Sequence, residues 1–300
     1  MKEDFQQIDF DDQLRDDWRA LLELAVREDL ADGCDLTTDS LVPPTAEGRA
    51  DVVAREAGVA AGLPAVGITL KRIEPRLTWT ANVEDGSPLV PGDCLGTIEG
   101  PAAGILKAER IMLNMLGRLS GIASLTGRYV EAVGGTSARI YDTRKTTPGW
   151  RRLEKYAVRC GGGQNHRGGL FEAVLIKDNH LALGAAVLDS GGYTPAEAVV
   201  KAREATAAGT IIEIEVDTLE QLDEVLPAGP DIVLLDNMSD AQLCEAVARR
   251  DSLKSSSELE ASGGVNLQTV SSIAQTGVQR ISVGALTHSA VGLDLGLDWR

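Results

Sequence analysis

The chain has 300 residues, with 29 Lys and Arg against 45 Asp and Glu, which gives a formal net charge of −16 and a pI near 4.6. This acidic balance excludes, as an expectation, nucleic-acid and membrane partners, because anionic partners bind basic surfaces. A hydrophobic share of 43% and a charged share of 25% are typical of globular proteins, and the length predicts about one or two domains.

Targeting segments and disulfides are not expected either. The start of the chain is acidic without an apolar segment, and no run approaches the about 18 apolar residues of a membrane helix. We interpret the cysteines as reduced, mostly buried thiols of a cytoplasmic protein, since they stand alone at Cys34, Cys94, Cys160 and Cys244. The three histidines show no metal-ligand spacing.

The first part of the chain, to about residue 110, mixes helical and extended patterns and predicts a small α+β domain. A helix is expected over Trp18–Leu30, where apolar residues recur near the helical period. Segment 1–35 holds 12 acidic and four basic residues, and we expect its acidity only to keep the protein soluble. The β-type runs that follow are Ala50–Arg55, Leu77–Val83 and Cys94–Glu99.

A long helix over Gly104–Val133 is predicted to lead into the second half of the chain. Three glycines within it, Gly117, Gly121 and Gly127, indicate close helix packing, because glycine lets a neighbouring segment approach the backbone. The pattern on either side of this helix differs, so we expect it to bridge two domains.

From about Ala138 onward, extended runs alternate regularly with amphipathic helices. Such alternation predicts parallel strands, and an α/β barrel closes them economically. The expected strands are Ala138–Thr143, Ala173–Ile176, Thr210–Val216, Asp231–Leu235, Leu259–Ala261 and Arg280–Val283. The later helices are expected to start at Thr194-Pro195, Thr218, Ser239 and Asn266.

Each of these strands brings charged residues or a glycine turn to its end. In a barrel the carboxyl ends of the strands converge on the active site, and the last two loops commonly hold a phosphate. The residues in chain order are Asp142-Thr143-Arg144-Lys145, Lys177-Asp178-Asn179-His180, Glu213 with Glu215, Asp236-Asn237, Ser262-Gly263-Gly264 and Gly284-Ala285.

Two adjacent cations, Arg144 and Lys145, follow the first of these strands. Their mutual repulsion favours an anion between them, and a solvated basic turn is the alternative. Thr147 is expected to cap a helix that Pro148 begins. The segment from Arg144 to Lys177, with eight basic and two acidic residues, is thus a basic island in an acidic chain.

A loop at 161–169 contains five glycines in nine residues, with His166 and Arg167 in its middle. Glycine is needed where the backbone approaches a ligand closely, and a guanidinium binds a carboxylate through two hydrogen bonds. This favours recognition of an anion. A flexible connector is the alternative for the loop, and a structural histidine is an equal alternative for His166.

Lys177, Glu215 and Asp236 occupy comparable places at the ends of three strands. We expect Lys177 to be buried in the barrel mouth, where a lysine needs a partner. The two acids either pair with the lysines or bind ribose hydroxyls and a divalent metal, and both roles are compatible. The turns at Ser262-Gly263-Gly264 and Gly284 form a plausible phosphate cradle, although each alone could be an ordinary turn.

Seven sequence blocks resemble one family, quinolinate phosphoribosyltransferase, also called nicotinate-nucleotide pyrophosphorylase (carboxylating). The blocks are AERIMLNMLGRLSGIA (108–123), YDTRKTTPGWRRLEKYAV (141–158), GGGQNHRGGLFEAVLIKDNH (161–180), IEIEVDTLEQL (212–222), IVLLDNM (232–238), LEASGGV (259–265) and ISVGALTHS (281–289). The resemblance implies transfer of phosphoribose from phosphoribosyl pyrophosphate (PRPP) to quinolinate with loss of CO₂ in NAD biosynthesis. It implies Mg²⁺ and no organic cofactor.

The same resemblance implies the fold and the assembly. The N-terminal domain is expected to be an α/β sandwich of residues 1–115, joined by the tail 287–300, and residues 116–286 are expected to form an incomplete barrel. The enzyme is expected to be a tight homodimer, with further assembly left open. Arg110 resembles an arginine lent by the partner subunit.

The site residues carried over by position fall into overlapping sets. The quinolinate ligands would be Arg110, Thr143, Arg144, His166, Arg167 and Lys177. The PRPP ligands would be Lys145, Glu215, Asp236, Ser262, Gly263, Gly264 and Gly284. Catalysis would depend on Lys145, Lys177, Glu215 and Asp236, and Mg²⁺ on Glu215 and Asp236, directly or through water.

Two other functions remain in view. A paralogue of the same fold, of the type associated with molybdate transport, would keep the phosphoribosyl site but use another acceptor. A phosphosugar-binding sensor would keep the fold without turnover. The intact TRKTTPG and NHR blocks weigh against the first, and the set of Lys145, Lys177, Glu215 and Asp236 weighs against the second.

Overall fold

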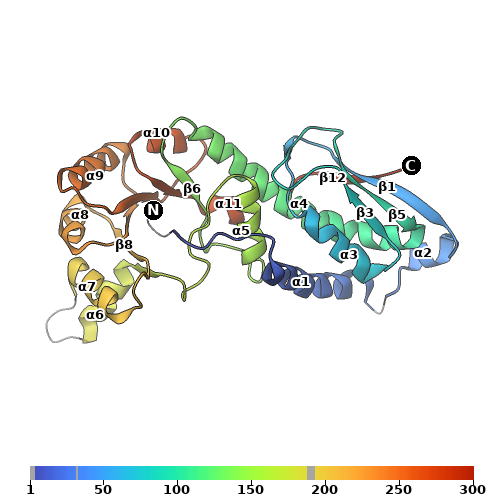
Figure 1. The fold of residues 1–300 in the computed structure, drawn as a ribbon, viewed down its shortest axis with the longest axis horizontal. Coiled ribbons are helices and arrows are strands. Elements are labelled where there is room, and N and C mark those ends of the chain that lie inside the picture. The colour runs from blue at the N-terminus through green and yellow to red at the C-terminus, as the bar shows by residue number, and fades with distance from the viewer. Residues whose placement is uncertain (1–3, 32, 188–192) are drawn as a thin grey trace. The chain divides into compact units, whose positions relative to one another are not determined.

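The computed structural model describes residues 4–31, 33–187 and 193–300, which form two compact units (Figure 1). The first unit comprises the chain up to Gln6 with Arg128–Arg144 and Gln164–Ala285. The second comprises Gln7–Gly127, Lys145–Gly163 and Leu286–Arg300. The chain therefore returns twice to the second unit, and the boundaries expected from the sequence at 115 and 116 stay a prediction.

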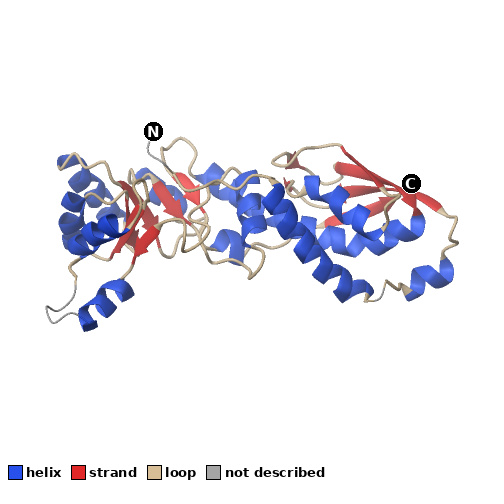
Figure 2. Cartoon of the chain, turned by 60° about the horizontal axis from the view of Figure 1, so that its bottom comes forward, coloured by secondary structure: helices blue, strands red, loops and turns tan. Residues whose placement is uncertain are grey.

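The second unit is built on an antiparallel sheet in the order β12-β1-β5-β3 (Figure 2). Its strands are β1 (Glu47–Ala54), β3 (Thr78–Ala81), β5 (Cys94–Pro101) and β12 (Leu295–Trp299), and a separate pair is β2 (Gly58–Val59) with β4 (Pro88–Leu89). Alternate residues of β1, Ala50, Val52 and Ala54, are buried in one core with residues of the helices α3 (Val66–Ile73) and α4 (Ala102–Ala132). The three strands expected from the sequence are confirmed within a few residues.

The helices of this unit follow from local signals. They are α1 (Asp12–Leu30), α2 (Leu36–Leu41), α3 (Val66–Ile73), α4 (Ala102–Ala132) and α5 (Arg151–Cys160), with a 3-10 turn at Leu63–Ala65. Helix α1 begins six residues before the expected Trp18, because the Asp11 side chain accepts a hydrogen bond from the backbone N–H of Leu14. Its face of Leu14, Trp18 and Leu22 is buried.

Two of the three glycines expected to permit close packing on α4 do so. A Cβ on Gly121 would lie 2.0 Å from the backbone oxygen of Val291, and one on Gly117 would lie 2.9 Å from that of Leu293. The neighbour is the extended segment near residue 292 rather than another helix. At Gly127 a Cβ would meet only ordinary contacts, the nearest at 3.6 Å, so no glycine is required there.

The first unit is built on a parallel sheet in the order β6-β11-β10-β9-β8-β7. The strands are β6 (Arg139–Tyr141), β7 (Val174–Ile176), β8 (Ile212–Val216), β9 (Ile232–Asp236), β10 (Glu258–Ser262) and β11 (Arg280–Ser282). All six expected strands are confirmed; four are shorter than expected, β9 is shifted by one residue, and β10 is longer by one residue at each end. The outer strands β6 and β7 are not paired with each other among the described residues, so the barrel is incomplete, as the resemblance implies.

Helices separate these strands along the chain (Figure 1). They are α6 (Asp178–Val187), α7 (Pro195–Ala205), α8 (Leu219–Val225), α9 (Asp240–Ser252) and α10 (Val270–Gln275), with a 3-10 turn at Leu226–Ala228, and the short helix α11 (Ala285–His288) follows the last of these strands, β11. Capping boxes at Thr194, Thr218 and Ser239 confirm three of the expected starts. The start expected at Asn266 is wrong, because its side chain accepts two backbone N–H groups of a turn and α10 begins only at Val270.

The helix expected to begin at Pro148 also starts later. Residues 148–150 form a turn, and α5 begins at Arg151. Thr147 is not the N-cap of α5, contrary to expectation. Its hydroxyl and its backbone N–H both donate to the carboxylate of Glu154. Glu154 is fully buried and also receives the guanidinium of Arg118, so this carboxylate rather than Pro148 fixes the segment.

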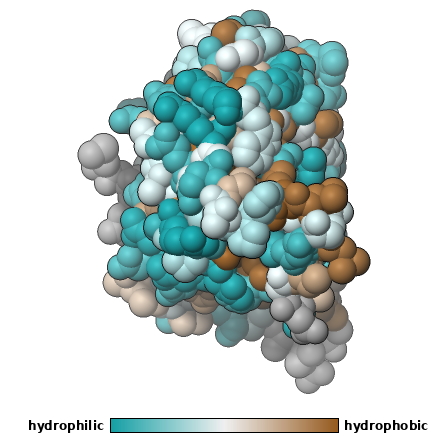
Figure 3. Space-filling view, turned by 90° about the vertical axis from the view of Figure 1, so that its right-hand side faces the viewer, coloured by the Kyte–Doolittle hydropathy of each residue, from teal (hydrophilic) through white to brown (hydrophobic). Residues whose placement is uncertain are grey.

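Surface features correct one expectation. The four cysteines are free, but they are not mostly buried: Cys34 and Cys244 are exposed, and Cys94 and Cys160 are partly buried. None of the helices in the described residues has the length and hydropathy to cross a bilayer. The face drawn in Figure 3 is largely hydrophilic, with hydrophobic side chains gathered on one side of it.

Candidate active site

A groove of about 830 Å³ runs along strand β7 of the first unit. Three cations expected to bind quinolinate, Arg144, Arg167 and Lys177, line it together, and we call them the groove cations. Arg144 lies beyond the end of β6, and Lys177 follows β7 directly. No acidic residue is among the described residues that line the groove, so its charge is positive and suits an anion.

Arg167 has a defined orientation in this groove. Its side chain is nearly buried, Nη1 donates to the backbone oxygen of Ala173 at 2.8 Å, and Nε has no hydrogen-bond partner among the described residues. Burial lowers the pKa of Arg167; Glu213 opposes this shift, and the like charge of Arg144 adds to it. A bound carboxylate would compensate both for the burial of the Arg167 charge and for its repulsion from Arg144.

Lys177 is half-exposed rather than buried, with 42% of its side chain accessible, which corrects the expectation from its apolar flank. It forms an ion pair with Glu215 of β8. The pairing considered as one alternative for Glu215 is therefore present. Asp236 ends β9, where its carboxylate accepts a hydrogen bond from the side-chain amide of Asn237 at 2.6 Å.

The carboxyl ends of β8, β9 and β10 lie next to one another. Asp236 pairs in register with Ser262, and Glu215 pairs with Leu234, two residues before Asp236. The sheet therefore brings Glu215, Asp236 and Ser262 to one edge, although they are far apart in the chain. Carboxylate oxygens at such an edge are suitable ligands for Mg²⁺, which usually binds one or two carboxylates together with substrate phosphates.

The turn after β10 requires glycine. Gly263 has φ +90°, and a Cβ there would lie 2.1 Å from the side-chain oxygen of Asn237. Gly264 also has a positive φ, +61°, with open space around it. Gly284 lies at the corresponding turn after β11. Backbone N–H groups in such turns are the groups that bind phosphate oxygens.

Two predicted site residues lie in the second unit. Lys145 has an exposed side chain, and its backbone oxygen accepts a hydrogen bond from the Thr287 hydroxyl at 2.7 Å. Arg110 is exposed on α4 and lines a pocket of about 450 Å³ together with Arg118. The first unit by itself thus holds the predicted residues other than these two, with Thr143 partly buried beside Arg144.

The glycine-rich loop is shaped by the end of β6. The fully buried carboxylate of Asp142 accepts the backbone N–H of His166 at 2.9 Å and the side-chain amide of Asn165 at 2.7 Å. The two hydrogen bonds that this one carboxylate accepts fix the loop immediately before Arg167. The strand end therefore sets the position of a groove cation that is 25 residues away in the sequence.

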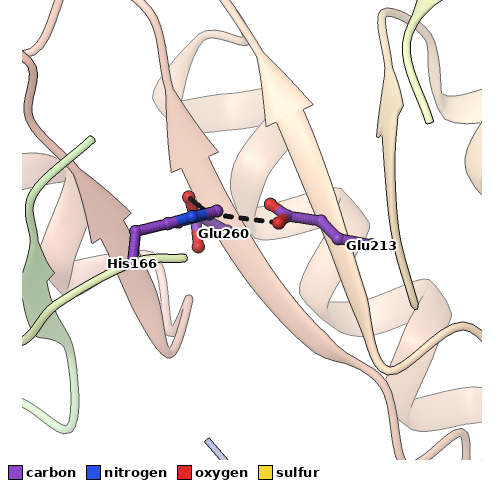
Figure 4. Close-up of side chains that lie close together, drawn as sticks. All are labelled: His166, Glu213 and Glu260. Atoms are coloured by element: carbon purple, nitrogen blue, oxygen red, sulfur yellow. Dashed lines mark ion pairs between the residues drawn. The ribbon is translucent and has the colours of Figure 1, made fainter. Parts of the chain in front are cut away.

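His166 lies beneath this loop in a buried cluster that the sequence did not predict (Figure 4). Its Nε2 is 3.1 Å from the carboxylate of Glu213 and 3.5 Å from that of Glu260, and all three side chains are buried. Its Nδ1 accepts the backbone N–H of Arg167 at 2.9 Å. Both ring nitrogens are thus occupied by groups of the protein, and His166 is not among the described residues that line the groove.

The cluster continues into a larger ion network. Arg280 donates to Glu260 at 2.9 Å and to Asp4 at 3.0 Å, and only 1% of its side chain is exposed. We call the buried side chains His166, Glu213, Glu260 and Arg280, together with the partly exposed Asp4 that joins them, the buried ion network.

Burial and the opposite charges act against each other in this network, and burial raises the pKa of Glu213. Burial alone would lower the pKa of His166 and the two carboxylates raise it, whereas the hydrogen bond that its Nδ1 accepts favours the neutral ring. Burial would likewise raise the pKa of Glu260, yet His166 and Arg280 lower it to about 2. The ligand atoms of His166, Glu213 and Glu260 lie within 4.8 Å of one another, as a metal site requires. Arg280 and His166 lie against the two carboxylates, while both oxygens of Glu213 have no hydrogen-bond partner among the described residues.

A signal for this network exists in the sequence. Glu213 and Glu260 each stand two residues before a predicted site residue, Glu215 and Ser262, and each lies between two apolar neighbours in its strand. Because side chains alternate along a strand, each shares its face with that site residue. The two glutamates between apolar neighbours could therefore have been found in the sequence, but their pairing with His166 on a distant loop could not.

Comparison with known proteins identifies the family. Residues 35–120 match the model of the quinolinate phosphoribosyl transferase N-terminal domain, and residues 122–298 match that of the C-terminal domain. The chain belongs to the quinolinate phosphoribosyltransferase family. It is 44% identical to the nicotinate-nucleotide pyrophosphorylase (carboxylating) of Mycobacterium leprae, over 93% of this chain and 96% of that protein. It is 39% identical to a probable enzyme of the same name from Bacillus subtilis, over 90% and 89%.

A solved structure supports the same conclusion for the fold. The nicotinate-nucleotide pyrophosphorylase of Francisella tularensis superposes with a TM-score of 0.89 and 33% identity, and the match covers 99% of this chain and all of that one. The expected fold class is confirmed: an antiparallel sandwich domain and a parallel α/β sheet, as in other quinolinate phosphoribosyltransferases. The roles of the individual site residues stay predictions.

Proposed function

We propose that this chain transfers the phosphoribosyl group of PRPP to quinolinate and releases pyrophosphate and CO₂, which gives nicotinate mononucleotide for NAD biosynthesis. The observation that supports it most is the groove with Arg144, Arg167 and Lys177 in its wall, in a chain that both family models match. Quinolinate carries two carboxylates, and guanidinium groups bind carboxylates through paired hydrogen bonds. In this proposal Thr143 completes the quinolinate site, and His166, which lies outside the described lining of the groove, supports the site through the backbone of Arg167.

The PRPP side of the site would occupy the neighbouring strand ends. The donor carries about five negative charges on its phosphates. We assign its phosphates to Lys145 and to the backbone turns at Ser262, Gly263, Gly264 and Gly284. Glu215 and Asp236 would bind its ribose hydroxyls and Mg²⁺. Bound Mg²⁺ would neutralise part of the phosphate charge, and the two carboxylates fit it by their position and chemistry.

The reaction balances with these residues. Departure of pyrophosphate breaks the anomeric C–O bond and leaves positive charge on the ribose carbon, which Glu215 and Asp236 would stabilise. The pyridine nitrogen supplies the electron pair of the new C–N bond. The quaternary nitrogen then accepts the electrons released when the adjacent carboxylate leaves as CO₂, and a proton takes its place on the ring. Lys177 lies beside Glu215 and would hold the substrate carboxylate near it.

The decisive experiment measures CO₂ and pyrophosphate release from quinolinate, PRPP and Mg²⁺. We expect both products in equal amounts, and none when Mg²⁺ is chelated. Pyrophosphate without CO₂ would support the paralogue with another acceptor, and binding of PRPP without turnover would support the sensor. Either result would contradict the proposed reaction.

We also propose a homodimer in which Arg110 completes the partner subunit's site. Arg110 is exposed on α4 of the second unit, whereas the groove belongs to the first unit. Arg110→Ala and Lys177→Ala, each inactive alone, should recover on mixing, because a heterodimer contains one site with neither defect. Random reassociation restores about one quarter of the wild-type sites. Absence of recovery, with heterodimers demonstrated by tagging, would contradict the shared site.

The finer location of the enzyme is likewise a proposal. Four free cysteines are compatible with a reducing compartment, and we propose the cytoplasm. Thiol titration of protein isolated under blocking conditions should find all four reduced. A disulfide in the isolated protein would count against this location.

A further inference from the structure

The residues that precede the second unit, Asp4–Gln6, pack against the underside of the quinolinate site. The Phe5 ring is 3% exposed and stacks on the imidazole of His166, with ring centroids 4.4 Å apart and planes at 29°. Phe5 also packs with Ala173 and Ile232 in a small apolar cluster. An aromatic side chain at this place therefore covers the face of His166.

Asp4 fastens the same segment through charge. Its carboxylate accepts hydrogen bonds from the Tyr141 hydroxyl at 2.7 Å and from Arg280 at 3.0 Å, and it pairs with Arg139 at 3.2 Å. Burial raises the pKa of Asp4, but the charge of Arg280 and the hydrogen bonds outweigh it, so the pKa is lowered. The segment is thus tied to β6 and β11 in its ionised form.

A second connection passes through Glu172. One oxygen of its carboxylate accepts the backbone N–H of Gln6 at 2.8 Å, and the other accepts the backbone N–H of Gly168. Gly168 follows Arg167 directly. His166 precedes Arg167, and its Nδ1 accepts the backbone N–H of Arg167. The segment therefore contacts His166 directly and is connected to Gly168 through Glu172. The backbone oxygen of Ala173, which packs on Phe5, accepts a hydrogen bond from the Arg167 guanidinium.

We propose that Asp4–Gln6 is a positioning segment for Arg167, and hence for recognition of the quinolinate carboxylates. The inference rests on the proposed function. Phe5 fixes the His166 ring, the ring holds the backbone N–H of Arg167, and Gln6 with Glu172 holds the next residue. Phe5, Gln6 and Glu172 are not among the described residues that line the groove. They therefore act through Arg167 and not on the substrate.

This inference predicts an effect on one substrate only. Replacing Phe5 loosens Arg167, whereas the turn at Gly263 is held by the hydrogen bond that the backbone N–H of Asn237 donates to the backbone oxygen of Ser262. The variant Phe5→Leu keeps an apolar side chain and loses the ring. The matched control is Phe10→Leu in the same part of the chain, where Phe10 packs on Tyr156 of the second unit, with ring centroids 5.7 Å apart.

The test measures binding of quinolinate by calorimetry and KM for PRPP by steady-state kinetics. We expect Phe5→Leu to weaken quinolinate binding about fivefold, in the range of an aromatic pair, with the KM for PRPP within about twofold of wild type. Phe10→Leu should match wild type for both. Asp4→Asn, which preserves shape, should act in the same direction as Phe5→Leu and provides the test if that variant does not fold.

A spectroscopic readout tests the stack itself. The chain has three histidines, so ¹³C-labelled histidine gives few ring signals. One of them should carry a ring-current shift that Phe5→Leu abolishes and Phe10→Leu retains. Unchanged quinolinate binding in a folded Phe5→Leu variant, or equal loss for quinolinate and PRPP, would overturn the inference. Wild-type protein that fails to bind quinolinate would instead overturn the proposed function, and the inference with it.

Discussion

The groove cations and the buried ion network are two charged clusters of one unit, and they differ in charge balance. In the network, His166 and Arg280 lie against Glu213 and Glu260 and leave little net charge. In the groove, Arg144 and Arg167 repel each other, whereas Lys177 pairs with Glu215, which is not among the described lining residues. A balanced buried cluster fixes a structure, whereas an unbalanced one at a surface is completed by a ligand.

The largest expected effect removes the central cation of the network. Arg280→Met leaves Glu260 buried without its arginine, and breaking a buried pair in this way costs about 3–5 kcal/mol of unfolding free energy. Urea denaturation followed by circular dichroism measures this change. Arg249→Met, which removes an arginine from exposed pairs with Asp223 and Glu245, is the control and should shift the midpoint far less. Equal shifts of the urea midpoint in the two variants would show that the buried ion network stabilises the fold no more than the exposed pairs do.

The second-largest effect concerns the binding of quinolinate in the groove and not the stability of the fold. Arg144→Ala should raise the KM for quinolinate about 100-fold, as expected for loss of a charge-assisted contact, with a change of no more than about threefold for PRPP. Its unfolding midpoint should stay close to that of wild type, since the cation repels Arg167 in the free protein. Comparable losses for both substrates would contradict the division of the site.

The smallest effect is the response of the network to pH. The folded pKa of Glu260 is lowered to about 2, below the about 4.3 of an unfolded glutamate. The stability that its charge contributes is therefore complete above about pH 4.3 and is lost as the pH falls through about 2. Urea midpoints of wild type should fall over this range more than those of Glu260→Gln, with Glu245→Gln, an exposed glutamate, as control. Parallel curves for wild type and Glu260→Gln would refute this.

The acidic N-terminal segment shows how far composition can mislead. Twelve acidic residues before position 36 predict a solubilising surface. Yet Asp4 accepts hydrogen bonds from Arg280 and Tyr141, and Asp11 caps α1 and pairs with Arg152. The expectation that this segment only keeps the protein soluble is therefore wrong. Net charge sums over residues without regard to partners, and partners are set by the fold.

The sequence by itself determined the alternation of strands and helices, the antiparallel domain, and the placement of Arg144, Lys177, Glu215 and Asp236 at strand ends. These follow from local periodicity and capping, which need only neighbouring residues. The later starts of α5 and α10 were missed, because a buried Glu154 and the turn at Asn266 override the local signals.

Only the tertiary structure decided how charges pair. The chain separates His166 from Glu213 by 47 residues and Asp4 from Arg280 by 276, and no spacing rule spans such intervals. Parallel strands bring their ends together regardless of sequence distance, and burial then makes each unpaired charge costly. For that reason the cations that a ligand would balance could be predicted from the sequence, while those balanced within the protein could be recognised only in its structure.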